Sequence, residues 1–310
     1  MQIINKHVFI IIMKEYLINS KNGLINILEG DDIDNCKGII LHLHGLGSHF
    51  QYIYNSCDDL RVKDAFFKSH GYKAFALEFY GHGKSEGSLH AIYDFNDLIV
   101  DLENVINIIE KKHNNIFIIA ESMGCAVAIK YIALRTHNIK GLILLSPMCG
   151  INHNKKISYC FERLLSYTSY LFPLLHYSIG TSIVKQSTNN KEYLQSICDT
   201  TSYPLCTMRE ILNVCTLIPK LGHLINCPTY ILYGEDDNII CTDSIEKLYY
   251  NINNTKLRQV IKNKGHYLLI ESNDKHLINF TDKSGKVAVN NPELILYMIV
   301  NWIDSSSCFA

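Results

Sequence analysis

The chain of 310 residues lacks a long hydrophobic run. The apolar stretch nearest its start, from Val8 to Met13, is far shorter than the roughly 20 residues that a membrane-spanning helix needs. No small-residue cleavage site follows it closely, so we interpret it as a buried first strand or a dispensable extension rather than a secretion signal. We therefore expect a cytoplasmic protein, with a membrane-peripheral location as the alternative.

The sequence also lacks an excess of charge of one sign. Lys and Arg number 29 and Asp and Glu number 30, so the formal net charge is -1. This balance gives no electrostatic reason to expect nucleic acid as a partner. The 11 cysteines show no CxxC spacing, and no Cys/His cluster has the spacing of zinc ligands. We therefore expect reduced thiols, no metal site and no organic cofactor.

What the sequence does contain is an alternation of short apolar segments with amphipathic ones. An Asn22-Gly23 turn predicts a hairpin between residues 15 and 28. Buried strands are predicted at 39–43, 72–79, 115–120, 140–145, 229–233 and 257–261. Helices are predicted at 94–110, where Asp94 is the N-cap, and at 124–133 and 291–303. The predicted class is α/β, with a mostly parallel central sheet flanked by helices.

One long segment, from about residue 148 to 224, interrupts this alternation. We interpret it as an inserted, mainly helical cap on a single domain of residues 1–310. Its apolar and aromatic side chains offer a face for an acyl chain, although packing of the cap on the core would need the same composition. These residues are Tyr159, Phe161, Leu164, Leu165, Tyr167, Tyr170, Leu171 and Phe172.

A serine at the end of one predicted strand has the surroundings of a nucleophile. Ser122 lies between a predicted strand and a predicted helix, with the small residues Ala120 and Gly124 two positions away on either side. Such a turn exposes the hydroxyl at a helix N-terminus, where it can attack a carbonyl carbon. A serine that only caps a helix is the alternative. The usual pattern is G-x-S-x-G, so the methyl group of Ala120 is a departure that predicts strain at the turn.

Glycines at the end of the strand 39–43 predict a site for the oxyanion that such an attack creates. The segment from His44 to Gly47 lets the backbone approach a substrate oxygen closely. We expect the backbone N–H groups of Leu46 and Met123 to donate to this oxyanion.

Two later strand ends supply an acid and a base. Asp237 follows the strand 229–233 and is the expected acid, with Asp236 as the alternative. His266 follows the strand 257–261 and is the expected general base, because a histidine oriented by a carboxylate can take a proton from the serine. His82, in a glycine-rich loop, is interpreted as a hydrogen-bonded loop residue.

At these residues the sequence resembles the monoacylglycerol lipase and lysophospholipase branch of the α/β-hydrolases, of the serine aminopeptidase S33 type. The resemblance runs from about residue 15 to 303, and its most branch-specific segment is Gly81 to Gly87. It implies an α/β-hydrolase fold with a cap. The order Ser122, Asp237, His266 is the one expected of that fold.

The sequence departs from this branch at several positions. Ala120 and Cys125 stand where the family often has glycine, and Glu121 stands where many members have histidine. We expect Cys125 to pack rather than react. Residues 273–290 look like an insertion and are predicted to form a surface loop.

The resemblance implies a serine esterase or lipase, a carboxylic ester hydrolase, that cleaves a monoacylglycerol or a lysophospholipid through an acyl-enzyme. One alternative is a carboxylesterase or thioesterase with a non-lipid substrate, because fold does not fix substrate. Another is an inactive binding protein, against which the intact Ser, Asp and His argue. The expected partner is a small molecule or a monoacyl lipid, with transient membrane association through the cap.

Overall fold

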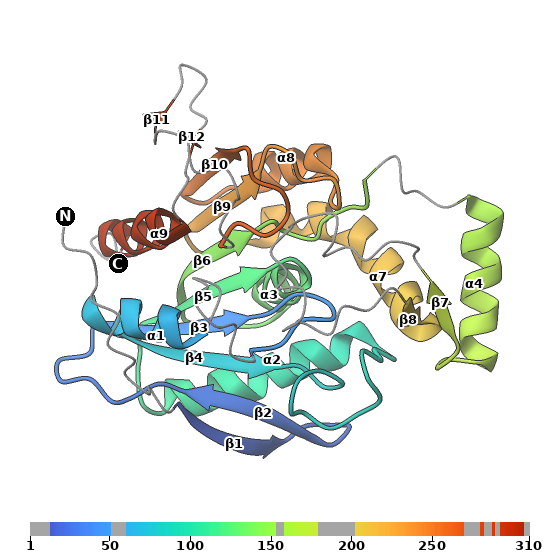
Figure 1. Ribbon diagram of the computed structural model, residues 1–310, viewed down its shortest axis with the longest axis horizontal. Helices are drawn as coiled ribbons and strands as arrows, with labels where there is room; N and C mark the ends of the chain where they lie inside the picture. The colour runs from blue at the N-terminus through green and yellow to red at the C-terminus, as the bar shows by residue number, and fades with distance from the viewer. Residues whose placement is uncertain are drawn as a thin grey trace.

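A ten-stranded sheet runs through the centre of the molecule (Figure 1). The computed structural model describes residues 13–50, 60–152, 158–178, 202–269, 280–281, 287–288 and 292–306. In spatial order the strands are β1 (Lys14–Asn19), β2 (Leu24–Glu29), β4 (Tyr72–Glu78), β3 (Gly38–Leu43), β5 (Ile116–Glu121), β6 (Ile139–Leu145), β9 (Thr229–Gly234), β10 (Lys256–Lys262), β12 (Val287–Ala288) and β11 (Phe280–Thr281).

The central strands, from β4 across to β12, are parallel, whereas β1 and β2 form an antiparallel hairpin on one side. Parallel strands put their carboxyl ends on one edge of the sheet, which is where sites gather in such folds. The predicted α/β class, the hairpin and all six predicted strands are confirmed, with ends that differ by one or two residues. Five of the strands are buried as predicted, whereas β10 is mostly half-buried, because it lies toward one side of the sheet.

Helices cover both faces of the sheet because side chains of each strand alternate between the faces. On one face lie α2 (Phe95–Glu110), α3 (Met123–Leu134) and α8 (Thr242–Asn251), and on the other lie α1 (Leu60–Ser69) and α9 (Pro292–Ser306). In β5, for example, Ile118 belongs to the first hydrophobic cluster and Phe117 to the second. The predicted helices form, and the side chain of Asp94 caps α2 by accepting from the Asn96 N–H at 2.8 Å.

Two helices were not predicted, because their buried faces carry few apolar side chains. Helix α1 buries Lys63 and Asp64 among its apolar side chains, and α8 buries only Ile245 and Leu248. The segment 273–290, predicted as a surface loop, contains β11 and β12, which extend the sheet. The rest of that segment and residues 8–12 of the N-terminal apolar stretch lie outside the described residues.

Between β6 and β9 the chain leaves the sheet for residues 146–228, here called the β6–β9 segment. Its described elements are α4 (Tyr159–Leu171), β7 (His176–Ser178), β8 (Ser202–Pro204), α7 (Leu205–Leu217) and the 3-10 helix η2 (Ile218–Leu224). The 3-10 helix packs on α3 and α8, α7 packs on η2, and α4 packs outermost on α7 (Figure 1). The small β7–β8 sheet was not predicted. Within the described ranges, no helix is both long and apolar enough to cross a membrane.

Candidate active site

Ser122 occupies the sharp turn between β5 and α3. Its φ of 49° and ψ of −110° place it in a backbone region that a residue with a side chain enters at a cost of about 1–3 kcal/mol. Neighbouring hydrogen bonds hold this strained conformation. The Ser122 N–H donates to the Leu145 carbonyl at 3.0 Å, and the Ser122 carbonyl accepts from the N–H groups of Cys125 and Met148, both at 3.1 Å.

The two small residues around Ser122 are needed to different degrees. A Cβ atom on Gly124 would lie 2.7 Å from the Leu43 carbonyl oxygen and 2.8 Å from that of His44, so only glycine fits there. Ala120 is fully buried within β5, and its φ is not positive. The backbone of Ala120 is therefore not in the left-handed region, whereas that of Ser122 is, and the effect of the Ala120 methyl group on the turn stays a prediction.

The structure brings His266 to Ser122 although the two are 144 positions apart in the chain. The His266 Nε2 lies 2.9 Å from the Ser122 Oγ, and its Nδ1 lies 2.8 Å from the Asp237 Oδ2. A histidine between a hydroxyl and a carboxylate can accept the hydroxyl proton, and the carboxylate stabilises the resulting charge.

Asp237, and not the alternative Asp236, faces His266. The side chain of Asp237 is fully buried, and its Oδ1 accepts from the N–H groups of Ile239 at 2.9 Å and Ile240 at 3.3 Å. These bonds fix the carboxylate, so that Oδ2 points at the histidine. Asp236, one residue earlier in the same turn, is exposed.

Ser146 holds the backbone of the histidine and was not singled out from the sequence. Its hydroxyl donates to the His266 carbonyl at 2.7 Å, while its own N–H donates to the Leu232 carbonyl at 2.8 Å. Its φ is 46°, a second strained position at the carboxyl edge of the sheet. The sequence signals were its place at a strand end, before Pro147, and the family resemblance of the segment from Leu144 to Pro147.

The expected oxyanion donors lie on either side of Ser122. The loop after β3 approaches so closely that a Cβ atom on Gly45 would lie 3.2 Å from the Ser122 Cβ. Met123 is the first residue of α3, where helix N–H groups have no partner within the helix. Among the described residues we find no acceptor for the N–H of Leu46 or of Met123. Within that part of the chain, the two N–H groups agree with the expected oxyanion donors, whose role stays a prediction.

His44 orients the peptide that carries the Leu46 N–H. Its Nε2 accepts from the Phe79 N–H at 3.1 Å, so the proton must sit on Nδ1, which donates to the Gly45 carbonyl at 2.8 Å. Burial lowers the pKa of His44 to about 3, so the ring stays neutral. His82 lies beside it, with ring centroids 5.2 Å apart and ring planes tilted by 47°, and its Nδ1 is 3.1 Å from the Tyr80 carbonyl, which agrees with a hydrogen-bonded loop residue.

Glu121, the residue before the nucleophile candidate, pairs with a buried lysine. The Lys63 Nζ lies 2.7 Å from the Glu121 Oε1, and only 1% of the lysine side chain is exposed. Cys125 follows on the other side, with its Sγ donating to the Ala120 carbonyl at 3.0 Å. Burial raises the pKa of this thiol well above its ordinary value, so Cys125 packs and is not an active nucleophile.

A cavity of about 380 Å³ opens at Ser122 and His266. Gly45 and Leu46 line it from the sheet side. The β6–β9 segment contributes a mostly apolar wall of Met148, Ile151, Tyr177, Tyr203, Met208, Ile211, Leu212 and Cys215. Glu121 is the only Asp or Glu, and Lys and Arg are missing, among the described residues that line it. In the same part of the chain, no three His, Cys, Asp or Glu side chains meet as metal ligands.

A mostly parallel sheet with a serine at a strand-to-helix turn, followed along the chain by an acid and a histidine, defines an α/β-hydrolase. A family model described as serine aminopeptidase, S33, matches residues 34–273, and the chain belongs to this family.

Within the family the chain is similar to the monoglyceride lipases. It is 25% identical to the rat monoglyceride lipase over 281 residues, which cover 86% of this chain and 82% of that protein. In fold it resembles a monoacylglycerol lipase from Paleococcus ferrophilus, with a TM-score of 0.71 at 18% identity over 91% of this chain and 99% of the other. It also resembles a soluble variant of the monoglyceride lipase of Saccharomyces cerevisiae in complex with a substrate analog, with a TM-score of 0.73 at 17% identity over 95% of both chains. Family and relatives together make the protein an ester hydrolase of the lipase and esterase type.

Proposed function

We propose that the protein hydrolyses the ester bond of a monoacyl lipid, and of a monoacylglycerol in preference to a lysophospholipid. One observation carries the proposal. The hydrogen-bonded chain of Ser122, His266 and Asp237 opens into an apolar cavity to which no described Lys or Arg contributes. The similarity to monoglyceride lipases supports the same substrate class.

The proposed mechanism begins with the transfer of the Ser122 proton to the His266 Nε2 as the Ser122 Oγ attacks the ester carbonyl carbon. Asp237 keeps the proton on the other ring nitrogen, Nδ1, and stabilises the imidazolium that forms. The N–H groups of Leu46 and Met123 donate to the oxyanion of the tetrahedral intermediate. His266 then gives its proton to the alcohol oxygen as the ester bond breaks. The alcohol departs, and the acyl group remains on Ser122 as an acyl-enzyme. Water, deprotonated by His266, releases the fatty acid.

The lining of the cavity supports an acyl chain on one side of the serine. Ile211, Leu212 and Met208 of α7 form much of the wall, and their burial by a hydrocarbon chain gains about 25 cal/mol for each Å² removed from water. We propose that the β6–β9 segment, containing the predicted cap at 148–224, is a cap on a single domain.

The charged residues around Ser122 support a substrate whose head group carries no charge. A phosphate is bound in proteins by Arg, Lys or a set of backbone N–H groups. No Lys or Arg is among the described lining residues, and the one carboxylate among them, that of Glu121, is neutralised by its ion pair with Lys63. A phosphodiester therefore meets no cationic partner in this lining, whereas a glycerol group needs none.

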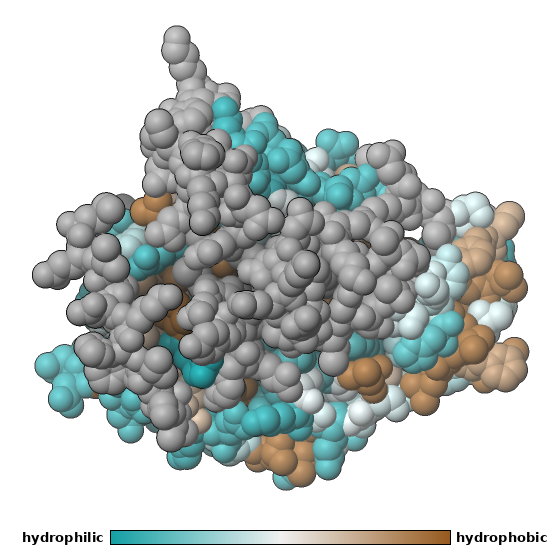
Figure 2. Space-filling model, viewed as in Figure 1, coloured by the Kyte–Doolittle hydropathy of each residue, from teal (hydrophilic) through white to brown (hydrophobic). Residues whose placement is uncertain are grey.

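The outer face of α4 supports transient contact with a lipid surface. Tyr170, Leu171 and Phe172 are between 60% and 74% exposed, and Figure 2 shows apolar residues gathered over α4. We propose that this face touches the membrane in which the substrate is dissolved. A cytoplasmic location is proposed as well, since all eight cysteines in the described part of the chain are free thiols.

A substrate panel with one acyl chain and three head groups tests the proposal. The expected order of kcat/KM is monooleoylglycerol first, then lysophosphatidylcholine and lysophosphatidate far lower. Ser122→Ala should abolish hydrolysis of all three and labelling by a fluorophosphonate probe. Cleavage of short aryl esters without cleavage of any monoacyl lipid would contradict the lipid substrate. Labelling that persists in Ser122→Ala would contradict the nucleophile.

A further inference from the structure

We propose that Tyr203, in the β6–β9 segment, is a positioning residue that holds the loop carrying the Leu46 N–H. The proposal rests on the role suggested above for Leu46. It assigns to the segment a part in the chemical step, besides that of a wall around the substrate.

Tyr203 reaches across from β8 and packs on the loop at Gly47. A Cβ atom on Gly47 would lie 2.8 Å from the Tyr203 Oη and 3.3 Å from its Cε1, so the tyrosine occupies the place that a side chain at 47 would take. The φ of Gly47 is +70°, a conformation that also favours glycine. Tyr203 is buried, and with Leu46 it lines the cavity.

The loop is well held on one side of the Leu46 peptide. The Gly45 carbonyl accepts from the His44 Nδ1 at 2.8 Å and from the Ser48 N–H at 3.2 Å. Gly47 lies on the other side and has no side chain with which to anchor itself. The Tyr203 ring rests on this residue, so it limits how far the turn can rotate. An oxyanion donor is effective only if its direction is fixed before the charge develops.

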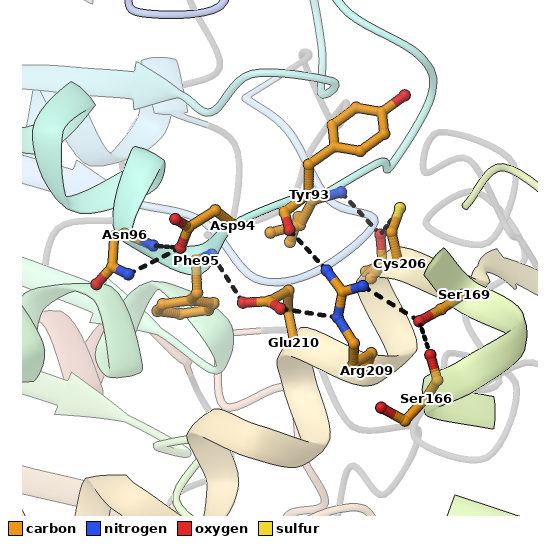
Figure 3. Close-up of polar contacts among 11 residues, drawn as sticks. Tyr93, Asp94, Phe95, Asn96, Ser166, Ser169, Cys206, Arg209 and Glu210 are labelled. Carbon is orange, nitrogen blue, oxygen red and sulfur yellow. Dashed lines mark hydrogen bonds and ion pairs between the residues drawn. The ribbon is translucent and has the colours of Figure 1, made fainter. Parts of the chain in front are cut away.

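The tyrosine is itself held firmly, because the start of α7 is fastened to the loop that precedes α2 (Figure 3). The Thr207 Oγ1 donates to the His90 carbonyl at 2.6 Å, and the Glu210 Oε2 accepts from the Phe95 N–H at 3.0 Å. Arg209 donates from Nη2 to the Tyr93 carbonyl at 2.8 Å.

Arg209 also fastens α4 to α7. Its Nη1 donates to the Ser169 Oγ at 3.2 Å, and its guanidinium lies 4.5 Å from the centre of the Tyr170 ring. Tyr203 immediately precedes this anchored region, and its ring centre lies 5.7 Å from that of His90. The hydrogen bonds that attach the segment to the core therefore also fix the position of Tyr203 and, through its ring, that of Gly47.

The test compares Tyr203→Ala, Tyr203→Phe and Tyr177→Ala on two substrates. Tyr177 is the partner of Tyr203 in the β7–β8 pairing and also lines the cavity, but the atoms nearest to Gly47 all belong to Tyr203. One substrate is p-nitrophenyl acetate, whose acyl group is too short to need the apolar wall. The other is a long-chain monoacylglycerol.

We expect Tyr203→Ala to lower kcat about tenfold or more on both substrates, a part of the roughly 100-fold loss that removal of a whole oxyanion donor causes. Tyr203→Phe keeps the ring against Gly47 and should restore most of kcat. Tyr177→Ala removes cavity wall without the contact to Gly47, so it should raise KM for the monoacylglycerol and lower kcat on the aryl ester less than Tyr203→Ala does. Tyr250→Ala, on the exposed face of α8 and outside the cavity, should leave kcat on both substrates within about twofold. A trifluoromethyl ketone, whose adduct carries an oxyanion, should bind Tyr203→Ala more weakly by about the same factor as the loss in kcat.

Thermal unfolding of each variant separates this result from a folding defect, and Tyr203→Leu replaces the alanine variant if that does not fold. A rise in KM for the monoacylglycerol alone would overturn the proposal, and so would a Tyr203→Phe variant as slow as Tyr203→Ala. Failure of the wild-type protein to cleave the monoacylglycerol contradicts only the lipid substrate, because the aryl ester still reports on Tyr203.

Discussion

The carboxyl edge of the sheet and the β6–β9 segment hold their functional side chains in different ways. At the sheet edge, strands end at fixed registers and backbone hydrogen bonds set each position, as the bond from the Ser122 N–H to the Leu145 carbonyl illustrates. In the segment, side chains such as Thr207 and Arg209 make the attachment. We infer that substitutions at the sheet edge affect the chemical step, whereas most substitutions in the segment affect substrate binding and selectivity.

The segment is itself uneven. Its α7 end is tied to the core by hydrogen bonds of Thr207, Arg209 and Glu210 near the start of the helix, whereas α4 turns an apolar face outward. Tyr203 lies next to the anchored start of α7 and packs on the loop at Gly47. Its replacement is therefore expected to lower kcat, although the residue belongs to the segment.

The sharpest test of the contrast is at the acid. Asp237→Asn should lower kcat by about 10⁴, because an amide beside Nδ1 favours the wrong tautomer of His266. Asp236→Asn, one residue away and exposed, should stay within about twofold of the wild type. Steady-state kinetics on an aryl ester measures both. Equal losses would show that the turn tolerates no change at all, and the assignment of Asp237 would fail.

The second test concerns the two small residues of the nucleophile turn. Gly124→Ala pushes a methyl group against the Leu43 and His44 carbonyls and should cost about 1–3 kcal/mol of unfolding free energy, together with most of the activity. Ala120→Gly should keep its activity and lose no more than about 1 kcal/mol, the usual cost of glycine in a strand. Urea unfolding and kcat are the measurements. A faster Ala120→Gly enzyme would support the prediction that this methyl group strains the turn.

The third test concerns the unfolding free energy and a buried carboxylate of helix α1, which packs against the sheet. Burial, with a smaller contribution from the Asp31 charge, raises the pKa of the Asp64 carboxyl from 3.8 to about 6. The folded protein therefore holds this proton more tightly than the unfolded chain, so stability present below about pH 4 is lost as the pH rises through 6.

Asp64→Asn removes this dependence and should raise the unfolding free energy at pH 7, relative to the wild type, by about 3 kcal/mol. At pH 4 the two proteins should differ little. Urea unfolding at a series of pH values makes the comparison, with Asp34→Asn on the surface as the control. A constant difference between pH 4 and 7 would contradict the buried charge.

The smallest effect is expected on the outer face of the segment. Replacing Tyr167 and Leu171 of α4 by serine should reduce binding to phosphatidylcholine vesicles, and kcat/KM on vesicle-borne monoacylglycerol, by about three- to tenfold. Hydrolysis of a soluble aryl ester should be unchanged, as it should be in Tyr250→Ser, whose side chain is equally exposed on α8. Unaltered vesicle binding would leave α4 as an ordinary surface helix.

Much of this molecule could be predicted from its sequence. The apolar runs of the central strands and the small residues at 120 and 124 gave the strand order along the chain and the nucleophile turn. Helices α1 and α8 were missed because Lys63, Asp64 and few apolar residues hide their buried faces. The pair β7–β8 was missed because three-residue strands have too little alternation to be recognised.

The sequence by itself determined the fold class, the family resemblance and the chain order of Ser122, Asp237 and His266, because periodicity and turn residues report which face of each element is buried. Only the tertiary structure decided that Asp237 rather than Asp236 meets the histidine, that Ser146 holds its backbone, and that Tyr203 rests on Gly47. These contacts join residues that lie far apart in the chain. They depend on registers between strands and on the packing of whole elements, about which local sequence patterns carry no information.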